Sequence, residues 1–280
     1  MHRHPVTGSA AIVVLALVFG VGAEEIARAT RGVINLPRVV RRNADDFHWR
    51  GRLAQGATIE VKGVNGDIIA TAAPGPEAEV VAERTGRRNN PEEVRLEIVE
   101  HSGGVTICAV YPSKDAGRPN ECRPGTDGRM NVQNNDVKVR FAVRVPEGLR
   151  FAGRSVNGQV EAQGLQGPLA LATVNGSATF STSSYGEAST VNGSIRGAIG
   201  ASGWQQGLTF HTVNGSITLE LPPDFSADVR ASTVNGEIST DFPLSASGRI
   251  SRRQVTGTIG AGGRRLDLDT VNGSVRLRRR

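Results

Sequence analysis

The residues with the most clearly defined chemistry in this sequence are its two cysteines. Cys108 and Cys122 are the only cysteines, and they are fourteen positions apart. Neither a Cys-x-x-Cys motif nor the Cys and His spacing of a zinc site is present, so no metal or redox site is expected. In an oxidising compartment such a pair forms a disulfide by default, and closing this loop would stabilise the fold by about 3 kcal/mol. Two buried free thiols are the alternative.

Acidic and imidazole side chains could supply general acids, general bases or metal ligands. Glycoside hydrolysis needs two carboxylates facing one cleft, and Asp267 with Asp269 is the most closely spaced acid pair of the C-terminal half. We interpret both as solvated strand residues. His48, His101 and His211 have no ligand-like spacing, and no Gly-x-Ser-x-Gly elbow occurs. The sequence therefore predicts no catalytic residue, no metal site and no cofactor.

The net charge of +6 comes almost entirely from arginine, since only Lys62, Lys114 and Lys138 among the 33 basic residues are lysines. The arginines are scattered along the chain, and aromatic residues make up only 4% of it. Nucleic-acid binders concentrate their positive charge and stack bases on aromatic side chains. Nucleic acid is therefore not an expected partner, whereas a basic, solvated surface favours an anionic one.

The N-terminal segment has the features of an export signal. A short basic start precedes an uncharged, mostly apolar run over 10–21, and small residues at 21–23 precede Glu24. The run is shorter than the roughly 20 residues of a membrane-spanning helix. We predict a signal peptide over 1–23, cleaved after Ala23, and a linker over 24–44. An uncleaved anchor is the alternative. The cleaved chain would have no transmembrane span and would lie in the periplasm, at the cell surface or in the medium.

The remaining chain has the alternation of half-buried strands. Apolar and polar side chains alternate over 57–62, 94–99 and 137–143, which is the period of a strand. No window has a sustained helical period. The sequence predicts an all-β protein, with a less regular N-terminal β portion over 45–150 that holds the disulfide loop, and a repeated portion over 151–280.

The tripeptide Val-Asn-Gly occurs seven times, and Thr precedes it in five of the copies. A degenerate copy centred on Thr256 fills the widest late gap. The asparagines of the seven copies are Asn65, Asn157, Asn175, Asn192, Asn214, Asn235 and Asn272. Asn-Gly between apolar alternations is also a strong hairpin signal. A string of hairpins therefore competes with a solenoid that turns a corner at each Asn-Gly.

Side-chain parity favours the solenoid. Apolar residues precede Thr and Asn on the same face, as Leu208 and Phe210 precede Thr212 and Asn214. A unit of this length cannot bury such a face alone, whereas stacked units bury it continuously. We therefore predict a single-stranded parallel β-helix or solenoid with Val-Asn-Gly corners.

The repeated residues suggest one structural column. We expect the seven Asn side chains to hydrogen-bond as a ladder along the stack, with Thr256 in the same column as a break. The Gly after each Asn is expected to supply a positive φ at the corner. The Val before each Asn has the opposite parity, so the Val side chains are either buried by a bend or form an external apolar stripe.

Several segments resemble a known family. They are 61–68, 143–148, the Thr-Val-Asn-Gly series, and 257–263 followed by 266–275. On these segments the chain, from about residue 47 to the C-terminus, resembles the putative-adhesin domains of exported bacterial proteins, which are β-solenoids of largely unknown function. The resemblance implies a parallel β-helix-like fold and an envelope location, and it supplies no catalytic residue.

These observations predict an exported, non-enzymatic module with a structural or interaction (adhesin-like) role in the bacterial envelope. Its partner would be an envelope protein or an anionic polymer. Tyr185, Trp204 and Phe225 lie where the units differ from one another, and aromatic side chains dominate interface energies, so they are candidate binding residues unless they cap the coil ends. A carbohydrate-active enzyme on a β-helix scaffold and an accessory of envelope-stress signalling are the alternative functions.

Overall fold

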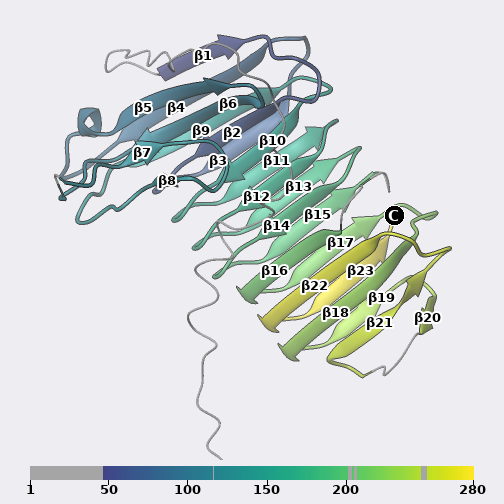
Figure 1. Ribbon diagram of the computed structural model, residues 1–280. Helices are drawn as coiled ribbons and strands as arrows, with labels where there is room; N and C mark the ends of the chain where they lie inside the picture. The colour runs from purple at the N-terminus through teal and green to yellow at the C-terminus, as the bar shows by residue number, and fades with distance from the viewer. Residues whose placement is uncertain (1–46, 116, 201–203, 205–206, 247–250) are drawn as a thin grey trace, which may run out of the picture.

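The computed structural model describes residues 47–115, 117–200, 204, 207–246 and 251–280. Their strands stack along one long axis in two large sheets (Figure 1), and only one short 3-10 helix, η1 (Pro91–Glu93), interrupts the β structure. The prediction of an all-β protein is confirmed. Neither sheet closes into a barrel. The predicted signal peptide (1–23) and linker (24–44) fall outside the described residues.

The first sheet has ten strands and ends in β1 and β19. In spatial order its strands are β1 (Phe47–Gly51), β4 (Ala78–Thr85), β9 (Lys138–Val145), β3 (Ile68–Ala72), β11 (Val160–Leu165), β13 (Ala178–Thr182), β15 (Ile195–Ile199), β17 (Ile217–Leu221), β23 (Val275–Arg279) and β19 (Ile238–Thr240).

The second sheet has eleven strands. In spatial order they are β20 (Leu244–Ala246), β21 (Gln254–Ile259), β18 (Ala227–Asn235), β22 (Arg265–Asn272), β16 (Leu208–Asn214), β14 (Gly186–Ser189), β12 (Leu169–Ala172), β10 (Arg150–Arg154), β2 (Thr58–Lys62), β6 (Gly104–Val110) and β5 (Arg95–His101). A separate pair consists of β7 (Glu121–Cys122) and β8 (Gly128–Arg129).

Strands in the middle of both sheets run parallel, and strands near the ends also pair antiparallel. In the middle, equivalent residues of successive units lie opposite each other, as Ala178, Ile195 and Ile217 do. The antiparallel pairs are β1 with β4, β4 with β9, β5 with β6, β18 with β21 and β20 with β21. The sheets are therefore mixed rather than parallel throughout.

The chain passes from the second sheet to the first at the Val-Asn-Gly tripeptides, as between β12 and β13 or between β16 and β17. These crossings do not form hairpins, because the strands on either side belong to different sheets. Alternate residues of each strand point between the sheets and are buried, for example Leu208, Phe210 and Thr212 in β16. This burial supplies the main apolar stabilisation of each unit.

A buried Thr hydroxyl links each unit to the next. Thr173 Oγ1 donates to the carbonyl oxygen of Gly158, and Thr190 Oγ1 donates to that of Gly176, both at 2.8 Å. Thr212, Thr270 and Thr233 repeat this bond at 2.8 Å with Gly193, Gly215 and Gly273. The hydroxyl thus satisfies a carbonyl oxygen at the crossing, where no strand partner is available.

The Asn side chains form a continuous ladder beside these bonds. From Asn157 onward, each Nδ2 donates to the Oδ1 of the preceding Asn in the stack at 2.7–2.9 Å. The spatial order is Asn65, Asn157, Asn175, Asn192, Asn214, Asn272 and Asn235. From Asn157 onward the Asn residues are exposed, so water competes for the same amide groups. Each bond is therefore worth less than a buried one.

The Gly of the motif is required mainly for close packing between units. A Cβ atom on Gly176 would collide with the carbonyl oxygen of Gly158, and one on Gly193 would collide with that of Gly176. Of the seven motif glycines, Gly66 lies well inside the positive region, at φ 122°. The expectation that each Gly supplies a positive-φ corner is therefore corrected, because backbone contact between neighbouring units explains most of the copies.

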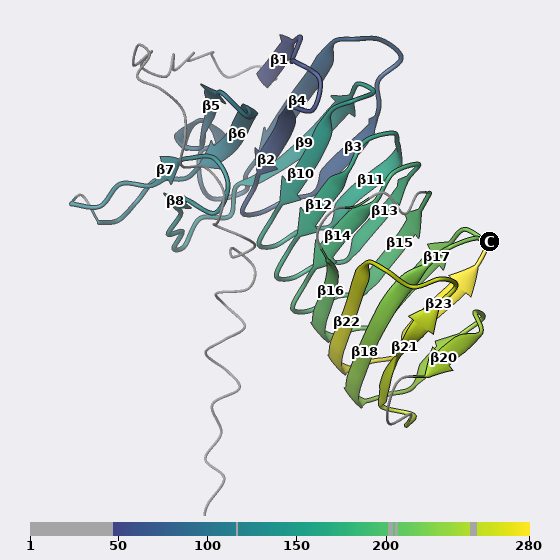
Figure 2. The ribbon, with the colours of Figure 1, turned by 45° about the vertical axis from the view of Figure 1, so that its right-hand side comes forward.

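Thr256 does not lie in the Asn column, contrary to the prediction. It belongs to β21, which runs antiparallel to β18 and places Thr256 opposite Arg230. The chain reverses at Ser251, which bridges Gln254, so this segment returns along its neighbour instead of adding a unit. The last strands, β22 and β23, then insert between the units on either side (Figures 1 and 2).

The Val residues of the motif form an external row. Val156, Val174, Val191, Val213 and Val271 are half-buried, Val64 is buried, and Val234 is 55% exposed. They lie beside the exposed Asn ladder, because each Val directly precedes an Asn in the sequence. The backbone also joins the two rows, since the Val156 carbonyl oxygen accepts the N–H of Asn175, in the next unit, at 2.7 Å. The alternative of an external apolar stripe therefore describes most of the row.

We predict that Thr212→Val destabilises the protein by about 1–2 kcal/mol, because it leaves the Gly193 carbonyl oxygen without its hydroxyl donor. Thr209→Val, on the exposed face of the same strand, is the matched control and should change stability by less than about 0.5 kcal/mol. Urea unfolding of both variants measures the difference. Equal losses would contradict a structural role for the Thr hydroxyl.

Candidate binding pocket beneath the disulfide loop

The three aromatic residues selected from the sequence are packed inside the protein. Trp204 and Phe225 are 1% and 2% exposed, and their ring centroids lie 5.5 Å apart. Tyr185 is half-buried and packs edge-on against Trp204 at 6.5 Å, and Phe242 extends the cluster. The prediction of surface anchors is therefore wrong for Trp204 and Phe225, because burial of their large apolar surfaces stabilises the core.

The acid pair Asp267 and Asp269 lies on β22, with His211 of β16 and Ser232 of β18 opposite Asp269 on the two neighbouring strands. Asp267 pairs with Arg265 at 2.6 Å, and Asp269 accepts a hydrogen bond from the Ser232 hydroxyl. Burial lowers the pKa of His211, against the opposing effect of Asp269. Among the described residues, no group of three or more His, Cys, Asp or Glu side chains is placed to hold a metal ion.

A long loop departs from the sheets and is fastened back onto them. It covers the described residues 111–115 and 117–137, between β6 and β9, and we call it the disulfide loop because Cys122 within it bonds to Cys108 of β6. The two Cα atoms lie 5.7 Å apart. Figure 2 shows that this part of the molecule, with β7 and β8, projects to one side of the stack.

Buried polar contacts hold the loop in shape. The Asn120 amide donates to the carbonyl oxygens of Tyr111 and Asn131 at 2.9 and 3.0 Å, and its Oδ1 accepts the Asn131 N–H at 2.7 Å. The Tyr111 hydroxyl donates to the Val137 carbonyl oxygen at 2.8 Å. Together these bonds join the two ends of the loop to its middle.

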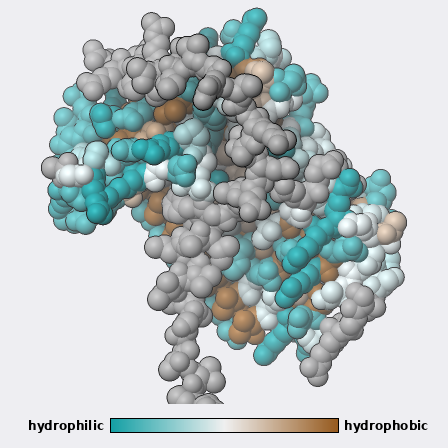
Figure 3. All heavy atoms as spheres, viewed as in Figure 1, coloured by the Kyte–Doolittle hydropathy of each residue, from teal (hydrophilic) through white to brown (hydrophobic). Residues whose placement is uncertain are grey.

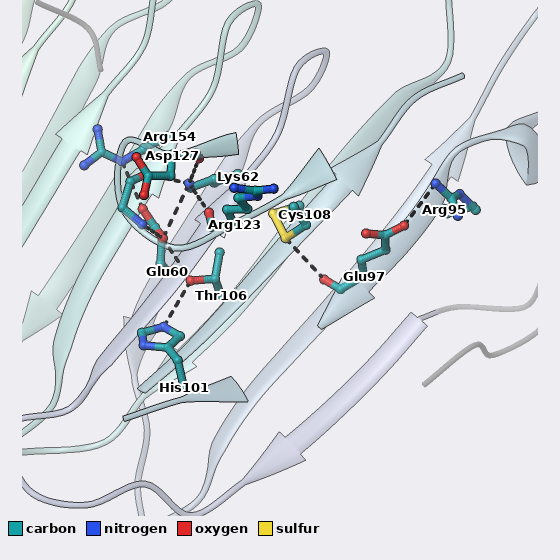
Figure 4. Close-up of a disulfide and its surroundings, with 12 residues drawn as sticks. Glu60, Lys62, Arg95, Glu97, His101, Thr106, Cys108, Arg123, Asp127 and Arg154 are labelled. Atoms are coloured by element: carbon teal, nitrogen blue, oxygen red, sulfur yellow. Dashed lines mark hydrogen bonds and ion pairs between the residues drawn. A yellow bond between two sulfur atoms is a disulfide. The ribbon is translucent and has the colours of Figure 1, made fainter. Parts of the chain in front are cut away.

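A buried carboxylate attaches the loop to the sheet. Glu60 lies on the outward face of β2, yet its side chain is only 6% exposed. Its oxygens accept from the Thr106 hydroxyl and the Gly125 N–H, each at 2.9 Å, and from Arg154 Nε at 3.1 Å. Figure 4 shows Glu60 between Arg154, Lys62 and Thr106. A buried charge needs such partners to offset its desolvation.

Lys62 adds a second attachment beside Glu60. Its ammonium donates to the carbonyl oxygens of Arg123 and Gly125, both at 2.5 Å, and lies 3.7 Å from Glu60 Oε2. Burial lowers the pKa of Lys62, although Glu60 acts in the opposite direction. The contacts show that the ammonium is committed to holding the loop.

Sequence reasoning missed this cluster. The alternation in 57–62 places Glu60 and Lys62 on the polar face of a strand, where charged side chains are ordinarily solvated. The return of the disulfide loop over β2, together with Thr106 and Arg154 from the flanking strands, buries them. The Pro and Gly residues and the two cysteines predict the loop from the sequence, but they do not predict which strand the loop covers.

Between the loop and the first Val-Asn-Gly units lies a pocket of about 800 Å³. Its lining includes Val64 and Val156 from the units, Met130 and Val132 from the loop, and the Cys108 side of the disulfide. Lys62, Arg154 and several asparagines also contribute. Apolar walls with a few polar groups are characteristic of ligand pockets. Around β5 to β8, the face drawn in Figure 3 is mainly hydrophilic.

We predict that replacing both cysteines, by Cys108→Ser and Cys122→Ser together, lowers the free energy of unfolding by about 3 kcal/mol, because the unfolded chain regains the entropy of the open loop. Urea unfolding of the oxidised protein and of the double variant measures the loss. A change below about 0.5 kcal/mol would contradict the role of the disulfide in bracing the loop.

Tyr111 makes stability depend on pH in the alkaline range. Burial raises the pKa of Tyr111 from 10.0 to about 12, so the folded state keeps a proton that the unfolded chain releases. The free energy of unfolding should therefore fall by up to about 2 kcal/mol as the pH rises from 10 to about 12. Tyr111→Phe should remove this part of the slope in unfolding curves. An unchanged slope would contradict the assignment.

Solved structures of two adhesion-related proteins are similar to the chain. No curated protein matches the chain. A solved structure of a putative cell adhesion protein from Clostridium sporogenes is similar at a TM-score of 0.44 and 8% identity, covering 84% of this chain and 100% of that one. A putative adhesin from Bacteroides fragilis has a TM-score of 0.29 and 9% identity, covering 86% of this chain and 100% of that one.

The family comparison covers the C-terminal half of the disulfide loop and the Val-Asn-Gly units from Asn157 onward. The described residues contain no helix that is both long and apolar enough to cross a membrane. The model of the family Toastrack DUF4097 matches residues 125–278, which is more than half of the chain. The chain therefore belongs to the Toastrack DUF4097 family.

Proposed function

We propose that this protein is an exported, non-enzymatic β-solenoid that acts as an interaction module of the bacterial envelope and binds its partner in the pocket beneath the disulfide loop. The observation that carries this proposal is the disulfide between Cys108 and Cys122. Disulfides persist in oxidising compartments outside the cytoplasm, and this one fixes the loop that forms one wall of the pocket.

The use of the repeated side chains also supports a binding role. Thr hydroxyls, Asn amides and Gly backbones are engaged in joining the units, and the buried Glu60 is paired with Arg154. In the pocket, carboxamides and apolar side chains are available for recognition by shape, hydrogen bonds and apolar contacts. In this proposal residues 1–23 are the cleaved signal peptide, 24–44 form the linker, 45–150 form the irregular β portion and 151–280 form the stacked units.

A photo-crosslinking amino acid at position 132 tests the proposal in cells that express the full chain. Val132 is half-buried and lines the pocket. We expect envelope-fraction adducts from position 132, on a mature chain that begins at Glu24. Ile69, 39% exposed on the outer face of β3, is the matched control position and should give few adducts.

Equal labelling from positions 132 and 69 would contradict a binding role for the pocket. Retention of the chain in the cytoplasm would contradict export. Hydrolysis of an envelope polysaccharide by the purified protein, abolished by one Asp or Glu substitution, would contradict the non-enzymatic role.

A further inference from the structure

We propose that the pocket beneath the disulfide loop binds a neutral, hydroxyl-rich oligosaccharide. This inference rests on the proposed function, because it names the ligand class of the same pocket. Three properties of the lining support it: balanced charge, a concentration of carboxamides, and apolar walls on both sides.

The three cations of the lining, Lys62, Arg129 and Arg154, are balanced by Glu121 and Asp127 of the lining and by Glu60 behind it. Glu60, behind the lining, lies 3.1 Å from Arg154 and 3.7 Å from Lys62. On the loop side, Arg129 lies 3.7 Å from Asp115. An anionic polymer is attracted by cations that lack such partners, and those of this pocket already have them. A neutral ligand leaves the pairs intact and brings no desolvated charge of its own.

Carboxamides are the commonest polar groups of the lining. They belong to Asn65, Asn131, Asn134, Asn135 and Asn157. A carboxamide offers two N–H donors and two acceptor lone pairs. The ladder uses one N–H and one lone pair of Asn157 and one lone pair of Asn65. In addition, Asn65 Nδ2 donates to the Asn135 carbonyl oxygen and Asn135 Oδ1 accepts the Val137 N–H, so each amide keeps part of its capacity. Neighbouring hydroxyls of a sugar both donate and accept, so they match this set of groups.

Apolar side chains line the pocket from both sides. Val64 and Val156 come from the stacked units, and Met130 and Val132 come from the loop. A slot with such walls accepts the C–H faces of a sugar ring while carboxamides bond its edges. This division into apolar walls and a few orienting polar groups is how pockets gain both affinity and specificity.

An extended peptide fits the floor of the pocket less well. Peptides commonly add a strand to an exposed sheet edge, but the backbone here is already paired between units. Asn157 N donates to Val64 O at 2.6 Å, Gly66 N donates to Asn157 O at 2.8 Å, and Val139 N donates to Asn65 O at 2.7 Å. Because these backbone groups are already bonded, the protein must recognise its ligand with the side chains of the pocket. Side-chain carboxamides suit the hydroxyl groups of a sugar better than the backbone of an added strand.

Val156 and Asn157 of the lining are followed along the stack by the Val and Asn residues of the next units. Val174 and Val191 are half-buried and Asn175 and Asn192 are exposed, so the same two kinds of group continue along the stack. A chain longer than the pocket gains further contacts at each unit. Affinity should therefore rise with the length of the oligosaccharide.

Isothermal titration calorimetry with the purified mature chain tests the inference. The probes are cellohexaose, chitohexaose and maltohexaose as neutral chains, their disaccharides, and hexagalacturonate as an anionic chain. We expect at least one neutral hexamer to bind more tightly than its disaccharide. Its affinity should change less than about twofold between about 50 and about 500 mM salt, because no charge is screened.

Two variants and one control locate the binding. Val132→Glu places a charge in the apolar wall and should weaken binding by about tenfold. Asn134→Gly removes a carboxamide at a residue whose φ is 53°, where glycine fits without strain, and should weaken binding by about threefold. Ile69→Glu, outside the pocket, should leave affinity unchanged. Melting curves check that each variant is folded.

Failure of this inference can be told apart from failure of the proposed function. Salt-sensitive binding of hexagalacturonate alone, or no binding of any neutral hexamer, would overturn the ligand class. If adducts at position 132 still formed and no glycan reduced them, the interaction role would remain with a different ligand. If position 132 gave no more adducts than position 69, the proposed function itself would fail.

Discussion

The whole stack depends on the close approach of glycine backbones between neighbouring units. With no Cβ at Gly176 or Gly193, the carbonyl oxygen of the preceding unit can lie directly against them. That approach brings the Thr hydroxyls within 2.8 Å of the glycine carbonyl oxygens and the Asn amides within bonding distance of each other. An alanine at these positions would force the units apart and weaken both rows together.

At the ends of the molecule, unlike in its middle, the sheets have edges that must be protected from pairing with other chains. A parallel stack of identical units would leave exposed edges that invite pairing with other chains. Here antiparallel strands pair near both ends, with β1 and β4 at one end and β20 and β21 at the other. The insertion of β22 and β23 between earlier units shows that the same motif accepts neighbours out of chain order.

The disulfide loop gives this regular scaffold an irregular site. A row of identical units presents the same groups at every step, so it forms no enclosed volume by itself. The loop adds the second wall, and its position depends on the disulfide, Asn120 and the contacts of Glu60 and Lys62. The cost of burying Glu60 is offset by three donors, and removing one of them would leave a buried charge poorly compensated.

The sequence by itself determined the β class, the repeated motif and the pairing partner of each cysteine. These follow from local periodicity, from the identity of the repeats and from the presence of only two cysteines. Tertiary structure decided where Thr256, Trp204, Phe225 and Glu60 lie. Antiparallel pairing removed Thr256 from the column, packing buried the aromatic rings, and a distant loop covered Glu60. Such placements depend on which distant segments contact each other, and the alternation of side chains within one strand does not specify those contacts.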